Sequence, residues 1–174
     1  WQPARAWAEP WRAFTGAFVH WNLAHLWGNL LGTAAVAALG RAARLPAQAM
    51  LACAVAWPLT QAALLIQPQL VHYGGLSGVL HAGMAVAALW LLARDRGQRR
   101  VLGAAIVAGL ILKLWLEEPW GPPLRLPGIP GNEGTDMAIA PLAHATGVAA
   151  GLLCAAVALA LAPLTMTSAL LQAS

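Results

Sequence analysis

Charged residues are scarce in this sequence. Lysine, arginine, aspartate and glutamate together make up 9% of the 174 residues, whereas hydrophobic residues make up 60%. This composition cannot be arranged around one water-soluble core. It excludes a soluble domain and predicts an all-α fold, a polytopic transmembrane helical bundle whose surroundings are the lipid bilayer.

Cysteine is also rare, and the metal-binding patterns are missing. The two cysteines, Cys53 and Cys154, lie inside apolar stretches, where we interpret them as buried thiols that act as small hydrophobic groups. Five histidines are present, but there is no HExxH and no Cys/His pair at ligand spacing. We therefore predict no metal site and no cofactor.

Several apolar stretches are long enough to cross a bilayer. No internal repeat and no second domain separates them, so we interpret residues 1–174 as a single transmembrane domain. The predicted spans are 23–39, 47–66, 76–93, 101–116 and 137–162.

Arginines predict the orientation of the bundle. They cluster at 41–44 and 94–100, and cytoplasmic loops of membrane proteins retain such an excess. The net charge of +4 is therefore a topology signal and gives no support for a nucleic-acid partner. The opposite side carries fewer basic residues, and these are mixed with acidic ones. The basic residues are Arg5, Arg12 and Arg125, and the acidic ones are Glu9, Glu117, Glu118, Glu133 and Asp136.

The start of the chain and the connection 117–136 lead to two further expectations. The sequence opens at Trp1 without an initiator methionine or signal peptide, so we expect that a preceding helix belongs to the full protein. The connection 117–136 is rich in proline and cannot be helical throughout. It is either an external loop that borders and gates a site or an inert surface connection.

Polar side chains are costly within a bilayer, so each one is a candidate site residue. His25 and Asn29 are four residues apart on one face of the first span, and Ser77 and His81 repeat this spacing on the third. We place His144 about six residues into the last span, roughly 9 Å below its start. The three helices can thus bring these groups to a similar depth.

Ser77 is the only serine inside a predicted span, and it needs a base to become a nucleophile. We predict His144 as that base. Acyl transfer also needs donors directed at the oxyanion, which the side chains of His25 and Asn29 and the backbone N–H of Ser77 can supply. The supporting glycines on either side of the serine, Gly75 and Gly78, let the backbone approach closely.

Each of these residues has another explanation when it is taken alone. An isolated serine in a span packs or bonds to a preceding carbonyl, and an isolated histidine or asparagine is commonly structural. We interpret His20 as holding its loop, and His72 and Tyr73 as interfacial residues. Only the conjunction favours an active site.

Three segments resemble the rhomboid family of intramembrane serine proteases: "WRAFTGAFVHWNLAHLWGNL", "GGLSGVLHAG" and "AHATGVAAG". They extend from residue 11 to residue 161 in the order typical of that family. The resemblance implies a six-helix core, of which this chain supplies five helices, and a Ser77/His144 dyad in a water-accessible cavity open to the outside. His81 stands where well-known rhomboids commonly have a tyrosine packed against the catalytic histidine.

The segments "HYGGLSGVLHAG" and "KLWLEEPWG" resemble the rhombosortase branch of that family. This implies a bacterial inner-membrane protein whose active site opens to the periplasm and whose partners are exported proteins with Gly-Gly-type carboxyl-terminal anchors. No acidic residue is expected beside His144, so His81 is expected to orient its ring by packing. Lys113, Glu117 and Glu118 are interpreted as snorkelling or interfacial residues.

Three alternatives remain open. The first is a transpeptidase-type variant, in which an amine in place of water takes the acyl group. The second is a catalytically silent rhomboid-like protein that binds membrane clients. The third is a small transporter or channel that uses the histidines as a proton relay.

Overall fold

The computed structural model describes residues 1–128 and 137–162. Within these ranges the regular secondary structure is helical, and the only extended pairing is an isolated bridge between Arg125 and Ile139. The predicted all-α bundle is therefore confirmed. The α-helices are α1 (Arg12–Thr15), α2 (Leu23–Ala42), α3 (Ala47–Ala63), α4 (Ser77–Arg94), α5 (Gly97–Glu117) and α6 (Pro141–Leu161), with short 3-10 helices at Pro3–Arg5, Gly16–Phe18 and Leu64–Ile66.

Four of the described helices are long and apolar enough to cross a membrane: α2, α3 with its 3-10 extension, α4 and α6. They coincide with four of the predicted spans. The fifth predicted span, 101–116, is helical as part of α5, but α5 is not among these four. Its 21 residues carry charges near both ends, at Arg99, Arg100, Lys113 and Glu117.

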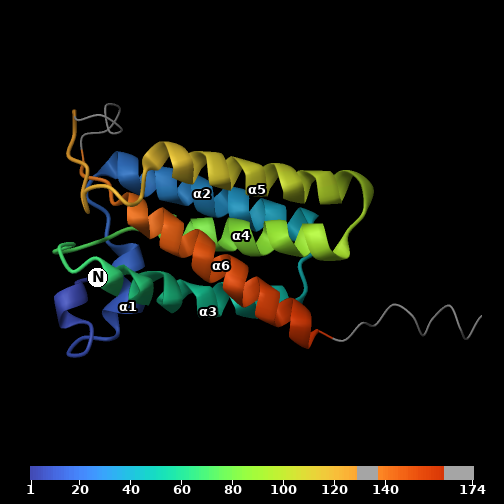
Figure 1. Ribbon diagram of the computed structural model, residues 1–174, viewed down its shortest axis with the longest axis horizontal. Helices are drawn as coiled ribbons and strands as arrows, with labels where there is room; N and C mark the ends of the chain where they lie inside the picture. The colour runs from blue at the N-terminus through green and yellow to red at the C-terminus, as the bar shows by residue number, and fades with distance from the viewer. Residues whose placement is uncertain (129–136, 163–174) are drawn as a thin grey trace, which may run out of the picture.

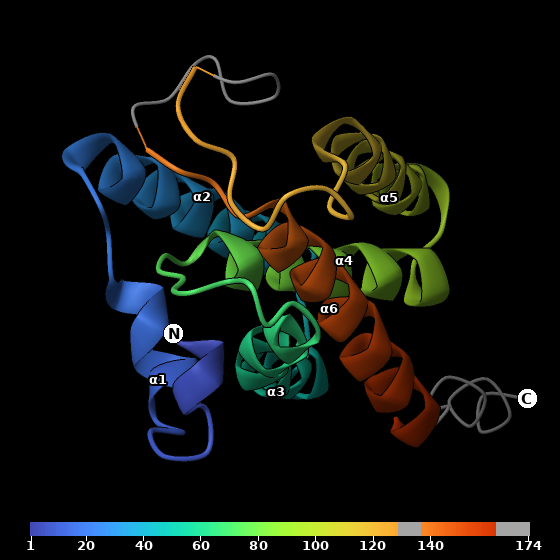
Figure 2. The ribbon, with the colours of Figure 1, turned by 60° about the vertical axis from the view of Figure 1, so that its left-hand side comes forward.

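Helix α4 is the centre of the bundle and packs against α2, α3, α5 and α6 (Figure 2). About half of its span is buried, compared with 6% of the span of α2. The helix is rich in alanine and glycine, so neighbouring helices can approach it from several sides. By contrast, α2 leaves most of its apolar side chains exposed on the outside of the bundle, where lipid can cover them.

The closest helix pair is α4 and α6, and two glycines make their approach possible. A Cβ atom on Gly147 would overlap the carbonyl oxygen of Gly78, and one on Gly151 would overlap that of Ala82. The GxxxG pattern formed by Gly147 and Gly151 is thus a packing surface. Because both partners are backbone atoms, no side-chain rotation could relieve the overlap.

Helix α6 begins at Pro141, four residues later than the predicted start at residue 137. Proline favours the first helical position, because its fixed φ suits the helix and its missing N–H has no partner there. Ile139 instead forms the backbone bridge with Arg125. His144 is therefore in the first turn of α6, roughly 4.5 Å from its start, and the predicted depth of about 9 Å was wrong.

Gly147→Ala should destabilise the bundle by about 1–3 kcal/mol, since the added methyl group forces α4 and α6 apart. Thermal unfolding in detergent measures the effect. The matched control is Gly28→Ala, because nothing outside its own helix lies within 4 Å of a Cβ built at Gly28. Equal unfolding temperatures for the two variants would contradict the close packing.

Candidate active site

Functional groups from three helices meet at one end of the bundle. Helix α4 begins with Ser77, His144 lies in the first turn of α6, and α5 ends with Glu117. Figure 1 shows that the starts of α4 and α6 and the end of α5 all lie at the same end. Because of the direction in which each helix runs, Ser77, His144 and Glu117 lie at the same height along the bundle.

Ser77 and His144 lie within hydrogen-bond distance of each other. The Nε2 atom of His144 is 3.1 Å from the Ser77 Oγ, although the residues are 67 positions apart in the chain. The structure thus brings together the hydroxyl and the imidazole that the sequence paired. A serine hydroxyl facing an imidazole nitrogen is the arrangement required for an activated nucleophile.

The other ring nitrogen of His144 contacts a carboxylate. Its Nδ1 is 2.7 Å from the Glu117 Oε2, and an ionised carboxylate can only accept a hydrogen bond. Nδ1 therefore carries the proton in the neutral ring, and the Nε2 lone pair faces Ser77. The expectation that no acidic residue lies beside His144 was wrong, because the packing of α5 brings Glu117 to the ring.

His81 stacks on His144, as expected from its position one turn after the serine. The ring centroids are 4.2 Å apart and the planes are 19° from parallel. The Nδ1–H of His81 donates to the carbonyl oxygen of Ser77 at 2.7 Å, which holds the His81 ring in place. His81 thus supports one face of the His144 ring.

Tyr73 is a site residue that the sequence interpretation missed. It is buried, and its hydroxyl lies 3.3 Å from the Ser77 Oγ and accepts the Gly78 N–H at 3.3 Å. Burial raises the pKa of Tyr73, so the phenol stays protonated and can donate to Ser77. The interfacial interpretation was wrong; the available signal was that the chain's one tyrosine stands four residues before the serine.

His25 and Asn29 both approach Gly75, which has a φ of +115°. A Cβ atom there would lie 2.5 Å from the His25 Nε2 and 3.4 Å from the Asn29 Nδ2. The predicted need for glycine is met, since a side chain would strain the backbone and overlap the His25 ring. The Asn29 Nδ2 is buried and has no hydrogen-bond partner among the described residues, so this donor is left unsatisfied.

The start of α2 holds His25 in position. The side chain of Asn22 accepts the backbone N–H of His25 at 2.7 Å and so caps the helix. The ring of His20 meets that of His25 edge-on at 4.9 Å, while the His20 Nδ1–H donates to the Phe18 carbonyl oxygen at 3.1 Å. His20 therefore fixes its own loop beside His25, in agreement with the structural role expected for it.

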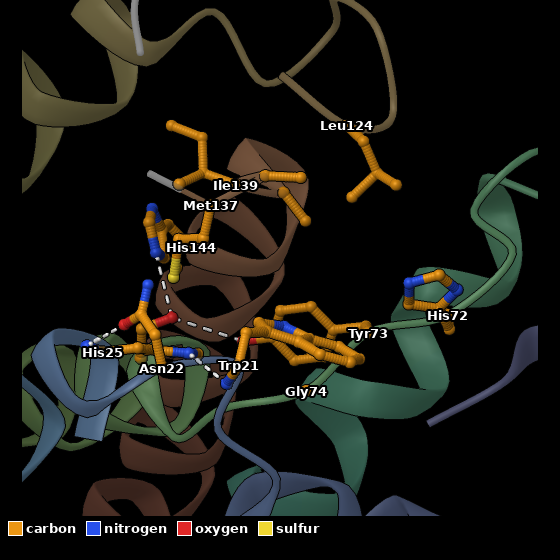
Figure 3. Close-up of a pocket in the computed structure, with 13 residues that line it drawn as sticks. Trp21, Asn22, His25, His72, Tyr73, Gly74, Leu124, Met137, Ile139 and His144 are labelled. Atoms are coloured by element: carbon orange, nitrogen blue, oxygen red, sulfur yellow. Dashed lines mark hydrogen bonds between the residues drawn. The ribbon is translucent and has the colours of Figure 1, made fainter. Parts of the chain in front are cut away.

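A cavity of about 660 Å³ lies over Ser77 and His144. In Figure 3, His25 and His72 lie at opposite sides of the view, Trp21 and Tyr73 lie between them, and Ile139 lies above His144. Asn29 is not part of its lining and lies buried behind Gly75. Ser77 and His144 both line this cavity, so a molecule inside it could reach them.

Comparison with known families gives one match. The family model described as Rhomboid domain matches residues 8–161, which include α2 to α6 and every residue of the site. No curated protein and no solved structure matches the chain.

Tyr73→Phe should slow the reaction of Ser77 with a fluorophosphonate probe about threefold to tenfold. The variant removes one neutral hydrogen bond to the serine, worth about 0.5–1.5 kcal/mol. The labelling rate in detergent measures the effect, and the unfolding temperature shows whether the fold is intact. An unchanged rate would mean that the phenol does not act on Ser77.

Proposed function

The chain belongs to the rhomboid family, and from this premise we propose that it is an intramembrane serine endopeptidase. The observation that carries the proposal is the 3.1 Å contact between the His144 Nε2 and the Ser77 Oγ, at the floor of a cavity. This contact supplies the two groups that acyl transfer requires, a nucleophile and its base. The substrates we propose are membrane-anchored proteins.

The proposed reaction follows from the geometry of the dyad. Ser77 Oγ attacks the peptide carbonyl carbon as its proton moves to the His144 Nε2, and the same proton then passes to the leaving amine nitrogen as the C–N bond breaks. Water attacks the resulting acyl-enzyme, gives its proton to Nε2, and releases the carboxylic acid. Ser77 then regains its hydroxyl proton.

The oxyanion formed during attack needs donors, and we propose His25, Asn29 and the Ser77 backbone N–H. Two observations support this assignment: the side chains of His25 and Asn29 converge on Gly75, and the Asn29 amide is a buried donor with no partner in the described residues. The Ser77 N–H belongs to the first residue of α4, where helical N–H groups have no intrahelical acceptor. A single oxyanion donor typically contributes about 10²- to 10³-fold in rate.

We propose that the protein resides in the bacterial inner membrane with the cavity facing the periplasm. The arginines that we predict to be cytoplasmic lie at the end of the bundle opposite to Ser77. There Arg94 donates to the Leu159 carbonyl oxygen at 3.1 Å and Arg99 to that of Ala42 at 3.0 Å. The positive-inside tendency supports this orientation. Glu133 and Asp136, counted for the outer side, lie outside the described residues.

As the preferred substrates we propose exported proteins with Gly-Gly-type carboxyl-terminal anchors. A regular helix hides its carbonyls in hydrogen bonds, whereas a glycine pair unwinds readily and exposes them. The resemblance of "HYGGLSGVLHAG" and "KLWLEEPWG" to the rhombosortase branch supports this substrate class. These two segments carry Ser77 and Glu117, which lie on either side of His144.

Ser77→Ala and His144→Ala should each lower client processing at least about 10³-fold. The test co-expresses the full-length protein with a Gly-Gly-anchored exported client and measures the processed client by immunoblot. The matched control is His72→Ala, since His72 lines the cavity but contacts Trp21 and not the dyad. Normal processing by Ser77→Ala at normal membrane levels would instead favour a client-binding protein.

The released client should end in a free carboxylic acid, because water is the proposed acceptor of the acyl group. Mass spectrometry of its carboxyl-terminal peptide measures this directly. An added mass at the cleaved carbonyl would contradict hydrolysis and identify a transferase that joins the client to an amine.

A further inference from the structure

The carboxylate of Glu117 lies on the side of His144 that faces away from Ser77, and the dyad mechanism gives it no role. Its Oε2 atom is 2.7 Å from the His144 Nδ1. Both side chains are shielded, with exposed fractions of 13% for His144 and 16% for Glu117. A charge-assisted hydrogen bond in such surroundings is strong, because little solvent competes for either partner.

Glu117 stands at an unfavourable place for a carboxylate. It is the last residue of α5, where the helix dipole presents its negative end. Lys113, one turn earlier, offsets part of this cost through a 2.6 Å contact with the Glu117 Oε1. A carboxylate at the negative end of a helix is locally unfavourable, and specific partners hold this one in place. Such a conflict indicates a functional constraint.

The backbone around the end of α5 holds the carboxylate in register with α6. Glu118 adopts a left-handed conformation with a φ of 46°, and its carbonyl oxygen accepts a hydrogen bond from the buried Arg125 at 3.2 Å. Arg125 pairs with Ile139 through two backbone hydrogen bonds of 2.8 and 3.0 Å. Ile139 lies two residues before α6, so the end of α5 is tied to the helix that carries His144.

His81 cannot replace Glu117 at the Nδ1 atom of His144. Its ring stacks face to face on that of His144, and its own Nδ1–H donates to the Ser77 carbonyl oxygen. Stacking restrains the tilt of the ring but does not select the nitrogen that carries the proton. The carboxylate of Glu117 does, because it accepts the Nδ1–H.

We propose that Glu117 is a positioning residue, which makes the site a Ser77–His144–Glu117 triad held by Lys113. The proposal rests on the proposed peptidase function and deepens it. When Ser77 Oγ bonds to the carbonyl carbon, its proton moves to Nε2, and the imidazolium keeps its Nδ1–H bond to Glu117. The carboxylate stays ionised throughout, and the Nε2 proton passes to the leaving amine.

The decisive variant is Glu117→Gln, which keeps the shape of the side chain and removes its charge. The amide NH₂ can donate to Nδ1, in which case the ring proton moves to Nε2 and Ser77 faces an N–H in place of a lone pair. We expect kcat for an anchored peptide in detergent micelles to fall about 10²- to 10⁴-fold, with KM changed less than about twofold.

Two further variants separate positioning from structural support. Glu117→Asp keeps the charge and should recover at least about tenfold of the lost kcat. Glu118→Gln is the matched control, because its carboxylate is adjacent in sequence, 63% exposed and paired with Arg125. It should match the wild type in kcat, KM and unfolding temperature.

The outcomes distinguish failure of this proposal from failure of the proposed function. If Ser77→Ala retains wild-type turnover, the peptidase assignment fails and the triad with it. If Ser77→Ala is inactive while Glu117→Gln keeps kcat within about twofold, the dyad stands and the triad is overturned. A matching loss of unfolding temperature in the glutamine and aspartate variants, without kcat recovery by aspartate, would also overturn it.

Discussion

The backbone contact between α4 and α6 is the constraint on which the site depends. Gly147 lies directly against the carbonyl of Gly78, and no side chain fits between them. Ser77 immediately precedes Gly78, and His144 is three residues before Gly147, on the same face of its helix. The packing that brings the two backbones together therefore also sets the 3.1 Å separation of hydroxyl and imidazole.

The same end of the bundle contains polar groups that an apolar surrounding would otherwise penalise. They form one hydrogen-bonded series that runs from α4 through α6 to α5: Tyr73, Ser77, His144, Glu117 and Lys113. Each residue in the series gives its neighbour a hydrogen-bond partner, which reduces the free-energy cost of placing these polar groups near the membrane. The series begins beside the cavity and ends at Lys113, whose side chain is 45% exposed, so both ends can reach water.

Much of the candidate site could be proposed from local patterns, but two of the residues that contact it could not. Ser77, His144, His25 and Asn29 stood out because polar residues are few in the predicted spans and recur at helical spacing. Glu117 was interpreted as an interfacial carboxylate, because nothing near it in the sequence indicates which helix α5 turns it toward. Tyr73 was missed for a similar reason, since it precedes α4 and only the folded loop directs its hydroxyl back to the serine. The polarity of a residue indicates that it is a candidate site residue, but it does not indicate which other residue it contacts.

The sequence by itself determined the surroundings of this protein, its helical class and the face of each helix that carries polar groups. Those properties follow from composition and from the 3.6-residue period, which depend only on neighbouring residues. The tertiary structure decided where α6 begins relative to His144 and that Glu117 lies against its Nδ1 atom. Such contacts depend on how helices far apart in the chain rotate and approach each other, and the packing of small residues between them settles that geometry.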